Sequence, residues 1–382
     1  MSSVNIHIYP SFFTNESRIL REATAIVEFG ISDKVILVGL WREGLPTEEQ
    51  ITDSISLIRV KGLFKKKSNS SWANLLVFAG VFLKLIRLSF REKPFAINVH
   101  SLTLLPFAVV TKWLSRCALI YDAHELETET HDSRGVRKKL EKIVERFFIR
   151  FADHTVVVSH SIENWYRNEY ALSKISTIRN IPILSVGTNS VNLRAMLGIK
   201  EDALLFVYVG LLAGGRGIDH LLKCFSQENL KDRHVVFIGY GDLEEMIKTN
   251  LSSNIHFLPA VPPSQVAAYV AGADVGLSLI EATCLSFYYS LPNKVFEYLS
   301  AGIPFVCSDF PDVRREFETY NVCWFTDPAQ DLSLVLGKIT CEDVQIRRRN
   351  VIGHRSRWDW NIEKHKLVDV YASIGKTIDT AK

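Results

Sequence analysis

The chain has 382 residues, of which 47% are hydrophobic and 23% are charged, and its formal net charge at pH 7 is +3. This length and composition predict two globular domains of ordinary size with substantial cores. So weak a net charge gives no reason to expect nucleic acid as a partner, and we predict none. The six cysteines include no C-x-x-C pair and no His/Cys cluster with ligand spacing, so we expect reduced thiols and no bound metal.

The first elements predict the start of a parallel α/β sheet. A strand over 4–9, a helix over 17–29 that ends at Gly30, and a strand over 34–40 follow one another. No G-x-G-x-x-G follows the first strand, which argues against a nicotinamide or flavin enzyme. The N-terminus does not read as a signal peptide, and no run reaches the roughly 18 apolar residues that span a bilayer. We therefore expect a cytoplasmic protein.

A basic and apolar segment covers residues 61–91. Three consecutive lysines at 65–67 precede a very apolar predicted helix over 72–90, which carries Lys84 and Arg87 near its end. This combination suits contact with anionic lipid headgroups. The alternative is a core helix of the sheet with solvated flanking charges. The segment predicts an anionic membrane as one partner, with the protein peripheral at the inner face of the cytoplasmic membrane.

Two further strands are predicted over 95–100 and 117–121, and the second runs into the sequence Y-D-A-H-E-L. It delivers Asp122 and His124 into a loop at a carboxyl strand end, where open parallel sheets bind ligands. His124 is therefore a candidate functional residue, although a lone histidine after a strand is more often structural. The mixed charges of the next predicted helix, over 137–152, are typical of a solvated helix face.

The second half of the chain repeats this alternation after a polar linker over 182–192. Strands are predicted over 203–209, 234–239, 255–258, 275–279 and 304–307, with helices between several of them. The sequence thus predicts two doubly wound, Rossmann-like α/β domains with a cleft between them, over 1–185 and 186–355. A last segment, 356–382, contains a helix over 358–374.

A glycine-rich loop, G-L-L-A-G-G-R-G, joins the first strand of the second half to a helix. Gly210, Gly215 and Gly217 would let backbone N–H groups approach an anion closely. Arg216 could bind two phosphate oxygens at once. A plain tight turn is the alternative.

The stretch S-L-P-N-K-V-F-E-Y-L-S-A-G-I-P predicts a helix that begins near Pro292 and ends at Gly302, followed by a buried strand. Asn293 and Lys294 fall at its N-terminus, where free N–H groups and the helix dipole attract anions. Glu297, one turn further, suits a pair of hydroxyls. Phosphate plus vicinal hydroxyls describes a nucleotide-sugar. A capping acid and a solvated lysine are the alternative.

The segment P-N-K-V-F-E-Y-L-S-A-G-I-P resembles the donor-site helix of the retaining GT-B glycosyltransferases of family 4. The resemblance implies that Glu297 binds the donor ribose, and that Lys294 and Arg216 stabilise the diphosphate. It implies that His124 lies near the reacting sugar. It also places the base pocket around Gly241 and Leu258.

The chain departs from the usual family pattern at two positions. Tyr289 stands where the family has its first glutamate, and Leu211 stands where an arginine usually follows the first glycine. Tyr289 bears on the contacts to the transferred sugar. Leu211 removes one cation from the glycine-rich loop, and Lys294 is a candidate to replace it.

The resemblance implies a GT-B fold in which the last helix crosses back onto the first domain. It implies a metal-independent hexosyltransferase without a cofactor, which uses a nucleotide-sugar donor and a glycan or lipid-linked acceptor. The expected setting is bacterial surface polysaccharide or lipopolysaccharide synthesis. Two alternatives stay open: a nucleotide-sugar 2-epimerase-like isomerase, and a non-catalytic nucleotide-sugar-binding partner.

Overall fold

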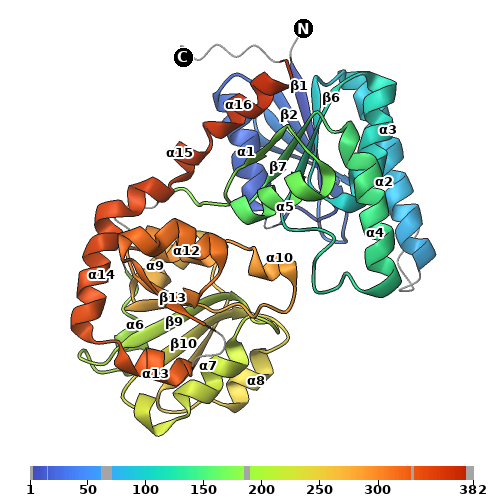
Figure 1. The fold of residues 1–382 in the computed structure, drawn as a ribbon. Helices are drawn as coiled ribbons and strands as arrows, with labels where there is room; N and C mark the ends of the chain where they lie inside the picture. Colours follow the sequence, from blue (N-terminus) through green and yellow to red (C-terminus); the bar gives the residue numbers. More distant parts are fainter. Residues whose placement is uncertain (1–2, 15, 62–70, 185–189, 328–330, 376–382) are drawn as a thin grey trace. The chain divides into compact units, whose positions relative to one another are not determined.

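A computed structural model of the chain describes residues 3–14, 16–61, 71–184, 190–327 and 331–375, with side chains described from residue 78 onward in the second helix. The chain divides into two compact units. The first comprises Met1–Arg179 with Lys364–Lys382, and the second comprises Asn180–Glu363 (Figure 1). Each unit is built around its own β-sheet. Within the part of the chain that the structure describes, no helix combines the length and the apolar character needed to cross a membrane.

The first unit contains an eight-stranded sheet with the strand order β3-β4-β2-β1-β5-β6-β7-β8, in which only the β3–β4 pair is antiparallel. Its strands are β1 (Val4–Ile8), β2 (Lys34–Leu40), β3 (Glu48–Thr52), β4 (Ile55–Val60), β5 (Ala96–Val99), β6 (Ala118–Ala123), β7 (His154–Val157) and β8 (Ile175–Thr177). From β1 the chain builds first towards β2 and later towards β5. The carboxyl ends of β1 and β5 therefore flank a topological switch point, where sheets of this kind bind ligands.

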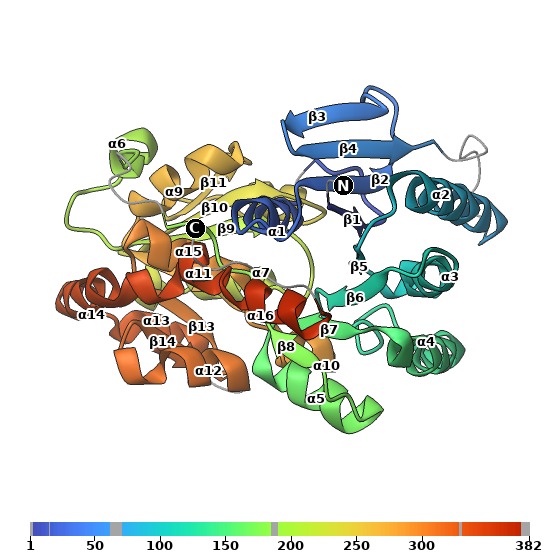
Figure 2. The same ribbon diagram turned by 90° about the horizontal axis from the view of Figure 1, so that it is seen from above.

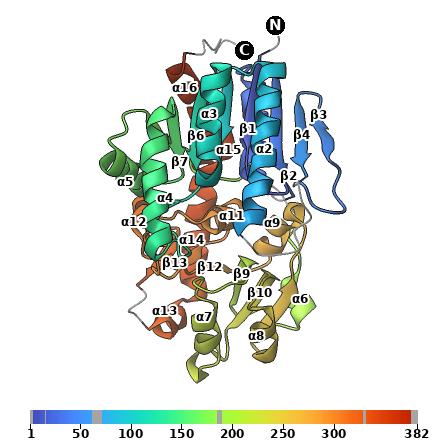
Figure 3. The ribbon, with the colours of Figure 1, turned by 90° about the vertical axis from the view of Figure 1, so that its right-hand side faces the viewer.

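Helices cover both faces of this sheet. They are α1 (Ser17–Glu28), α2 (Ser71–Glu92), α3 (Leu105–Ser115), α4 (Gly135–Phe148), α5 (His160–Tyr170) and α16 (Lys366–Ser373), with short 3₁₀ turns η1 (Leu102–Leu104) and η2 (Ile149–Phe151). Helices α2, α3 and α4 lie side by side on one face, and α1 and α16 lie on the other (Figures 2 and 3). The last helix of the chain thus packs on the first strands.

The second unit contains a six-stranded parallel sheet with the order β11-β10-β9-β12-β13-β14. Its strands are β9 (Leu205–Leu211), β10 (His234–Tyr240), β11 (Ile255–Pro259), β12 (Val275–Ser278), β13 (Phe305–Ser308) and β14 (Cys323–Thr326). Its helices are α6 (Leu193–Leu197), α7 (Ile218–Phe225), α8 (Glu244–Thr249), α9 (Pro263–Ala271), α10 (Leu285–Tyr288), α11 (Asn293–Ala301), α12 (Pro311–Phe317), α13 (Leu332–Lys338), α14 (Cys341–His354) and α15 (Trp360–Glu363), with 3₁₀ turns η3 (Glu228–Leu230), η4 (Glu318–Tyr320) and η5 (Arg355–Trp358). Here the switch point falls between β9 and β12.

Alternate residues of β9 enter two different cores, as the two-residue repeat of a strand requires. Val207 and Val209 pack with buried residues of α9 and α11. Phe206 and Tyr208 pack with buried residues of α7 and α8 on the opposite face. Both cores are rich in aliphatic and aromatic side chains, which is typical of a sheet buried on both faces. This packing fixes the strand whose carboxyl end carries the glycine-rich loop.

The helix predicted around residues 292–302 is confirmed in detail. It runs over Asn293–Ala301, with Pro292 as the extended residue before its first turn. It ends at Gly302, whose φ of +80° is the left-handed conformation that glycine adopts without strain. The following strand is Phe305–Ser308.

The structure divides the chain at 179/180 and 363/364, whereas the sequence predicted boundaries at 185/186 and 355/356. Trp358 explains the second difference, because it is buried in the core of the second unit against Phe317 and Tyr320. The predicted helix over 358–374 is accordingly interrupted, and its parts are η5, α15 and α16. The β3–β4 hairpin was not predicted, because β3 is exposed along its length and has no apolar alternation.

Candidate functional site

The loops after β9 and β12 are in close contact at the switch point of the second unit. A Cβ on Gly217 would lie 2.6 Å from the Leu279 Cβ, so only glycine fits there. The Glu281 N–H donates to the Gly215 carbonyl at 3.0 Å. Gly215 and Gly217 have φ values of +76° and +69°, which other residues adopt only with strain. The glycine-rich sequence is therefore required by a close approach of two loops, and it ends at the first turn of α7.

Lys294, the second residue of α11, reaches the end of β9. Its Nζ lies 3.6 Å from the centroid of the Tyr208 ring. Its Cε would lie 3.0 Å from a Cβ on Gly210, whose φ is +120°. Gly210 thus leaves the space that the lysine side chain occupies. The cation and the glycine-rich loop, far apart in sequence, lie together at one sheet edge.

The environment of Lys294 is unfavourable for a positive charge. Burial, and then the charge of Arg216, lower the pKa of Lys294 well below its usual range, while Glu297 acts weakly in the opposite direction. No ion pair within 4.0 Å joins Lys294 to a carboxylate among the residues described. Burial also raises the pKa of the Tyr208 hydroxyl. Two cations beside a helix N-terminus therefore form a site that would favour an anion.

The other predicted residues of this unit lie at different distances from Lys294. Gly241 has a φ of +148°, and a Cβ there would lie 2.3 Å from the Leu212 carbonyl oxygen, so it joins the loops after β9 and β10. Asn293 is exposed at the first position of α11, and Glu297 is half-buried one turn further. Leu258 lies on the edge strand β11, two strands from β9, and packs against the core. The structure thus gathers the glycine-rich loop and α11, but not Leu258, around Lys294.

A second group of polar residues lies at the switch point of the first unit. His124 follows β6, and His100 follows β5. His100 Nδ1 lies 3.0 Å from His124 Nε2 and 3.0 Å from Asp122 Oδ2. Arg18 on α1 donates from Nη2 to Asp122 Oδ1 at 3.0 Å and from Nη1 to the Ile178 carbonyl at 2.9 Å. Asp122, which the sequence placed in the same strand-end loop as His124, is therefore anchored by an arginine.

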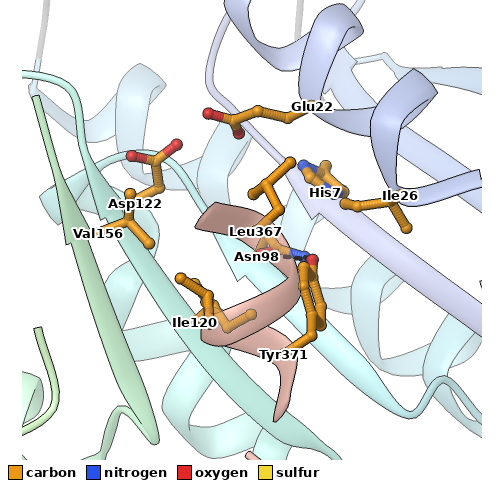
Figure 4. A pocket seen from close by; sticks show the side chains of 10 residues that line it. His7, Glu22, Ile26, Asn98, Ile120, Asp122, Val156, Leu367 and Tyr371 are labelled. Atoms are coloured by element: carbon orange, nitrogen blue, oxygen red, sulfur yellow. Dashed lines mark hydrogen bonds between the residues drawn. The ribbon is translucent and has the colours of Figure 1, made fainter. Parts of the chain in front are cut away.

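His7 and Glu22 extend this group into the interior. His7 Nδ1 lies 2.8 Å from His100 Nε2, and Glu22 Oε1 lies 3.0 Å from Arg18 Nη2. His7 and Glu22 line a small cavity with Asp122 and with residues of α16, among them Tyr371 (Figure 4). The final helix of the chain therefore forms one wall of this cavity.

Burial controls the charges of the group. It lowers the pKa of His7 well below the usual value and that of His100 to about 4, so both rings are neutral at pH 7. Burial raises the pKa of Glu22 well above its usual value. For Asp122 burial acts in the same direction, but the Arg18 charge and the neighbouring histidines hold its pKa well below the usual range. The result is one ionised pair, Arg18–Asp122, surrounded by neutral groups.

The same residues form two sets with the composition of a metal site. One set is His7, Glu22 and His100, and the other is His100, Asp122 and His124; within each, the candidate ligand atoms lie within 4.8 Å of one another. The sequence could not reveal these sets, because their members come from four separate segments. Arg18 already supplies a cation to Asp122, so the absence of a metal remains our prediction for this site.

Sequence reasoning found Lys294 and His124 but missed their neighbours. Tyr208 stands in the middle of an apolar strand, and nothing in that pattern distinguishes it from a core residue. His7 and Glu22 lie inside a predicted strand and helix. His100 had a usable signal, because it ends a predicted strand as His124 does. Parallel strands place such residues at the same sheet edge.

Two family models match the chain. The model described as "Glycosyltransferase Family 4" covers residues 18–181, and the one described as "Glycosyl transferases group 1" covers residues 190–351. Over 127 residues the chain is 32% identical to TuaC of Bacillus subtilis, whose name describes a glycosyltransferase of teichuronic acid biosynthesis. That alignment spans 33% of this chain and 30% of the relative.

Solved structures share the fold at low sequence identity. Sucrose-phosphate synthase from Thermosynechococcus elongatus superimposes with a TM-score of 0.80 at 13% identity, over 97% of this chain and 99% of that one. Anabaena HepE in complex with UDP-glucose gives 0.72 at 11% identity, over 97% and 99%. These neighbours are GT-B glycosyltransferases, so the predicted fold class is confirmed. The two family models match the two halves of the chain, which is therefore similar to GT-B glycosyltransferases of the family-4-like kind.

Proposed function

We propose that the chain is a retaining, metal-independent glycosyltransferase that moves a sugar from a nucleotide-sugar to a glycan or lipid-linked acceptor. The observation that carries this proposal is Lys294, a desolvated cation at a helix N-terminus beside Arg216 and a glycine-rich loop. The names of two similar proteins agree with such a role, because HepE was solved with UDP-glucose and TuaC is named for polysaccharide biosynthesis.

The charge of the leaving group explains why this arrangement would catalyse transfer. When the glycosidic bond breaks, its electron pair moves to the diphosphate, whose negative charge grows. Lys294, Arg216 and the first N–H groups of α11 would stabilise that charge without reorganisation. Glu297, one turn along the same helix, would accept hydrogen bonds from the ribose hydroxyls. In this proposal the two cations take the part that a metal plays in other transferases.

The test begins with a thermal-shift panel of UDP-, GDP-, ADP- and TDP-sugars on the wild type and on Lys294→Met. The methionine keeps the length and apolar part of the side chain while removing the charge. We expect one nucleotide to stabilise the wild type and not the variant. Product NMR in excess EDTA should then show transfer with the donor's anomeric configuration retained. An inverted product, or transfer abolished by EDTA, would refute the proposed mechanism.

One observation favours the isomerase alternative. Burial, then the charges of Glu125 and Glu145, raise the pKa of Glu127 to about 8, and this residue lies three positions after His124. An epimerase needs acid–base groups that titrate near neutral pH. Incubation of the nucleotide-sugar without an acceptor separates the two functions. Epimerised nucleotide-sugar would support the isomerase, whereas unchanged donor that reacts only when acceptor is added would support transfer.

Binding to a membrane is also a proposal, and we place the binding surface on other residues than the sequence indicated. Residues 62–70, with the predicted lysine cluster, lie outside the described part, as do the side chains of 71–77. The rest of α2 buries Leu85 and Leu88 but exposes Leu83 and Phe90. It therefore combines the core helix and the surface helix that the sequence left as alternatives.

Helix α4 carries the stronger surface. Four of its apolar side chains are 48–83% exposed and, by their spacing, lie on one face of the helix: Val136, Leu140, Ile143 and Phe147. Its charged face was predicted to be simply solvated, but Glu145 is buried and accepts hydrogen bonds from three tyrosines. The exposed cations of this layer include Arg87 and Arg91 on α2, Arg116 after α3, and Arg137, Lys139, Arg146 and Arg150 on and after α4.

We propose that the outer face of α2, α3 and α4 docks on an anionic membrane. An apolar stripe flanked by lysine and arginine complements the acyl chains and headgroups of such a surface. Trp113 and Leu114 on α3, both about half exposed, extend the stripe between the two outer helices. A membrane is favoured over a second copy of the chain because the flanking cations would repel their own copies.

Liposome flotation tests this docking surface. Ile143→Glu with Phe147→Glu should lose binding to vesicles that contain phosphatidylglycerol, and high salt should weaken binding of the wild type. Ile352→Glu, at a residue equally exposed on α14 of the second unit, is the control and should float normally. Equal flotation of both variants, or dimerisation of the wild type that the double variant abolishes, would refute membrane docking.

A further inference from the structure

Three histidine rings form a continuous chain that ends at His124. His124 Nε2 lies 3.0 Å from His100 Nδ1, and His100 Nε2 lies 2.8 Å from His7 Nδ1. Asp122 fixes the direction of this chain. Its Oδ2 lies 3.0 Å from His100 Nδ1, and an ionised carboxylate only accepts hydrogen bonds. His100 therefore carries its proton on Nδ1.

The position of that proton determines the tautomer of His7. A neutral imidazole has one N–H, so His100 Nε2 accepts and His7 Nδ1 donates to it. His7 Nε2 then has a lone pair and no proton. This atom is buried, in a residue that is 1% exposed, and it has no hydrogen-bond partner among the described residues. An acceptor in such a place needs a donor.

The cavity beside His7 contains a matching donor. Glu22, 3% exposed, lines the same cavity, where Arg18 Nη2 lies 3.0 Å from its Oε1. Figure 4 shows His7 and the carboxylates of Glu22 and Asp122 around this space. The cavity has room for about one water molecule. Burial favours the protonated form of Glu22, because it raises the pKa of that carboxyl well above the usual value.

We propose that Glu22 is a proton reservoir for His124, joined to it by a water molecule in this cavity and by the rings of His7 and His100. In the transfer, Glu22 gives its proton to the water, and the water gives one to His7 Nε2. His7 Nδ1 then passes its proton to His100 Nε2, and His100 Nδ1 passes its proton to His124 Nε2. Every N–H or O–H bond that breaks is replaced by one that forms. Glu22 ends as a carboxylate, and His124 gains one proton and a positive charge.

The surroundings of Glu22 would stabilise its carboxylate form when His124 becomes protonated. Arg18 Nη2 lies 3.0 Å from Glu22 Oε1 and 3.0 Å from Asp122 Oδ1, so the same guanidinium would stabilise both carboxylates. The titratable or charged groups that face Glu22 are Arg18 and Arg21 on α1, His7 on β1, His100 after β5, Asp122 on β6 and Tyr371 on α16. Only Arg18 and Arg21 among them are cationic at neutral pH.

This inference rests on the proposed function and on the family resemblance, which implies that His124 lies near the reacting sugar. An incoming diphosphate would draw a proton along the chain, and its departure would return the proton to Glu22. His124 would thus become a charged hydrogen-bond donor without taking a proton from solvent. His7, His100 and Glu22 act through His124, and we regard them as positioning residues.

Glu22→Gln is the decisive variant. Glutamine keeps a donor for the water and His7, so the static chain survives, but it has no proton to release. We expect kcat to fall about 100-fold, the lower end of the range for an acid–base group, with little change in the KM for the donor. The wild type should also lose kcat as pH rises through the Glu22 titration, and the variant should lack this limb. Glu28→Gln, at an exposed position on the same helix, is the control.

Turnover by Glu22→Gln within twofold of the wild type, with the alkaline limb intact, would overturn the proposal. A second measurement does not depend on activity. Nitrogen NMR of histidine-labelled protein should show His7 protonated on Nδ1 and bare on Nε2. A proton on His7 Nε2 would also overturn it. If His124→Ala keeps full turnover while His7 shows the expected tautomer, the catalytic role of His124 and the proton reservoir are both refuted, and only the hydrogen-bonded arrangement of His7 and His100 is supported.

Discussion

Gly210→Ala should separate backbone strain from ligand binding at the proposed donor site. The new Cβ would lie 3.0 Å from Lys294 Cε, on a backbone whose φ is +120°. A side chain in this conformation costs about 1–3 kcal/mol of stability. The lysine end is flexible and would move aside, so the contact itself should add little to that cost. The displacement should nevertheless remove Lys294 from the position in which it faces the loop.

The expected effect on binding follows from the loss of one charge-assisted hydrogen bond. Such a bond contributes about 1.5–3 kcal/mol, so the Kd for the nucleoside diphosphate should rise roughly 10–100-fold. Gly214→Ala is a matched control in the same loop, because its Cβ would have nothing within 4 Å and its φ is not positive. Calorimetry measures binding, and thermal unfolding measures stability. A Gly210→Ala protein that is less stable but binds with unchanged affinity would show that Lys294 does not contact the diphosphate.

Three further predictions concern single side chains. Lys294→Met should stabilise the ligand-free protein by about 1–3 kcal/mol, because it removes a partly buried, desolvated charge with no carboxylate within 4.0 Å among the described residues. Since the folded-state pKa of Lys294 is depressed, wild-type stability should rise with pH towards the usual lysine pKa, and chemical denaturation of the methionine variant should lack this rise. Glu297→Ala should weaken nucleotide-sugar binding roughly 10–100-fold, and unchanged affinity in a folded variant would exclude a ribose contact. The wild type should lose stability as pH rises above the ordinary glutamate pKa, by at most about 1.4 kcal/mol per pH unit, because folded Glu22 keeps a proton that the unfolded chain releases. Glu22→Gln should not show this loss. If the stability difference between wild type and variant were the same at pH 5 and pH 8, the predicted sign would be contradicted.

The parts of the fold that the sequence predicted are those with strong local signals. The strand over 34–40 was predicted at its observed bounds, and the helix ending at Gly302 was marked by Pro292 and by the glycine itself. The hairpin β3–β4 had no such signal. Its inner strand is held by pairing with β2, and pairing between strands is not visible in local periodicity.

The candidate site was predictable only where one segment contained its chemistry. Lys294 and Glu297 share one helix turn, and Arg216 lies in a glycine-rich loop, so their types and spacing already indicated an anion. The group around His124 could not be found in this way, because Arg18, which pairs with Asp122 and Glu22, lies on a helix about a hundred residues earlier. Burial, which decides the charge of Glu22, is a property of the assembled core.

The position of α16 has a consequence for biosynthesis. Tyr371 accepts a hydrogen bond from Asn5 at 2.7 Å, across 366 residues of sequence, and it also contacts Asn98. While the ribosome is still making the second unit, β1 and β5 lack this partner, and the space beside His7 and Glu22 lacks its wall. The first unit therefore reaches its final packing only after the segment from residue 364 has been released. In a nascent chain arrested before that point, the polar side chains of His7 and Glu22 would lack the cover of α16. We expect chaperones and proteases to recognise such intermediates.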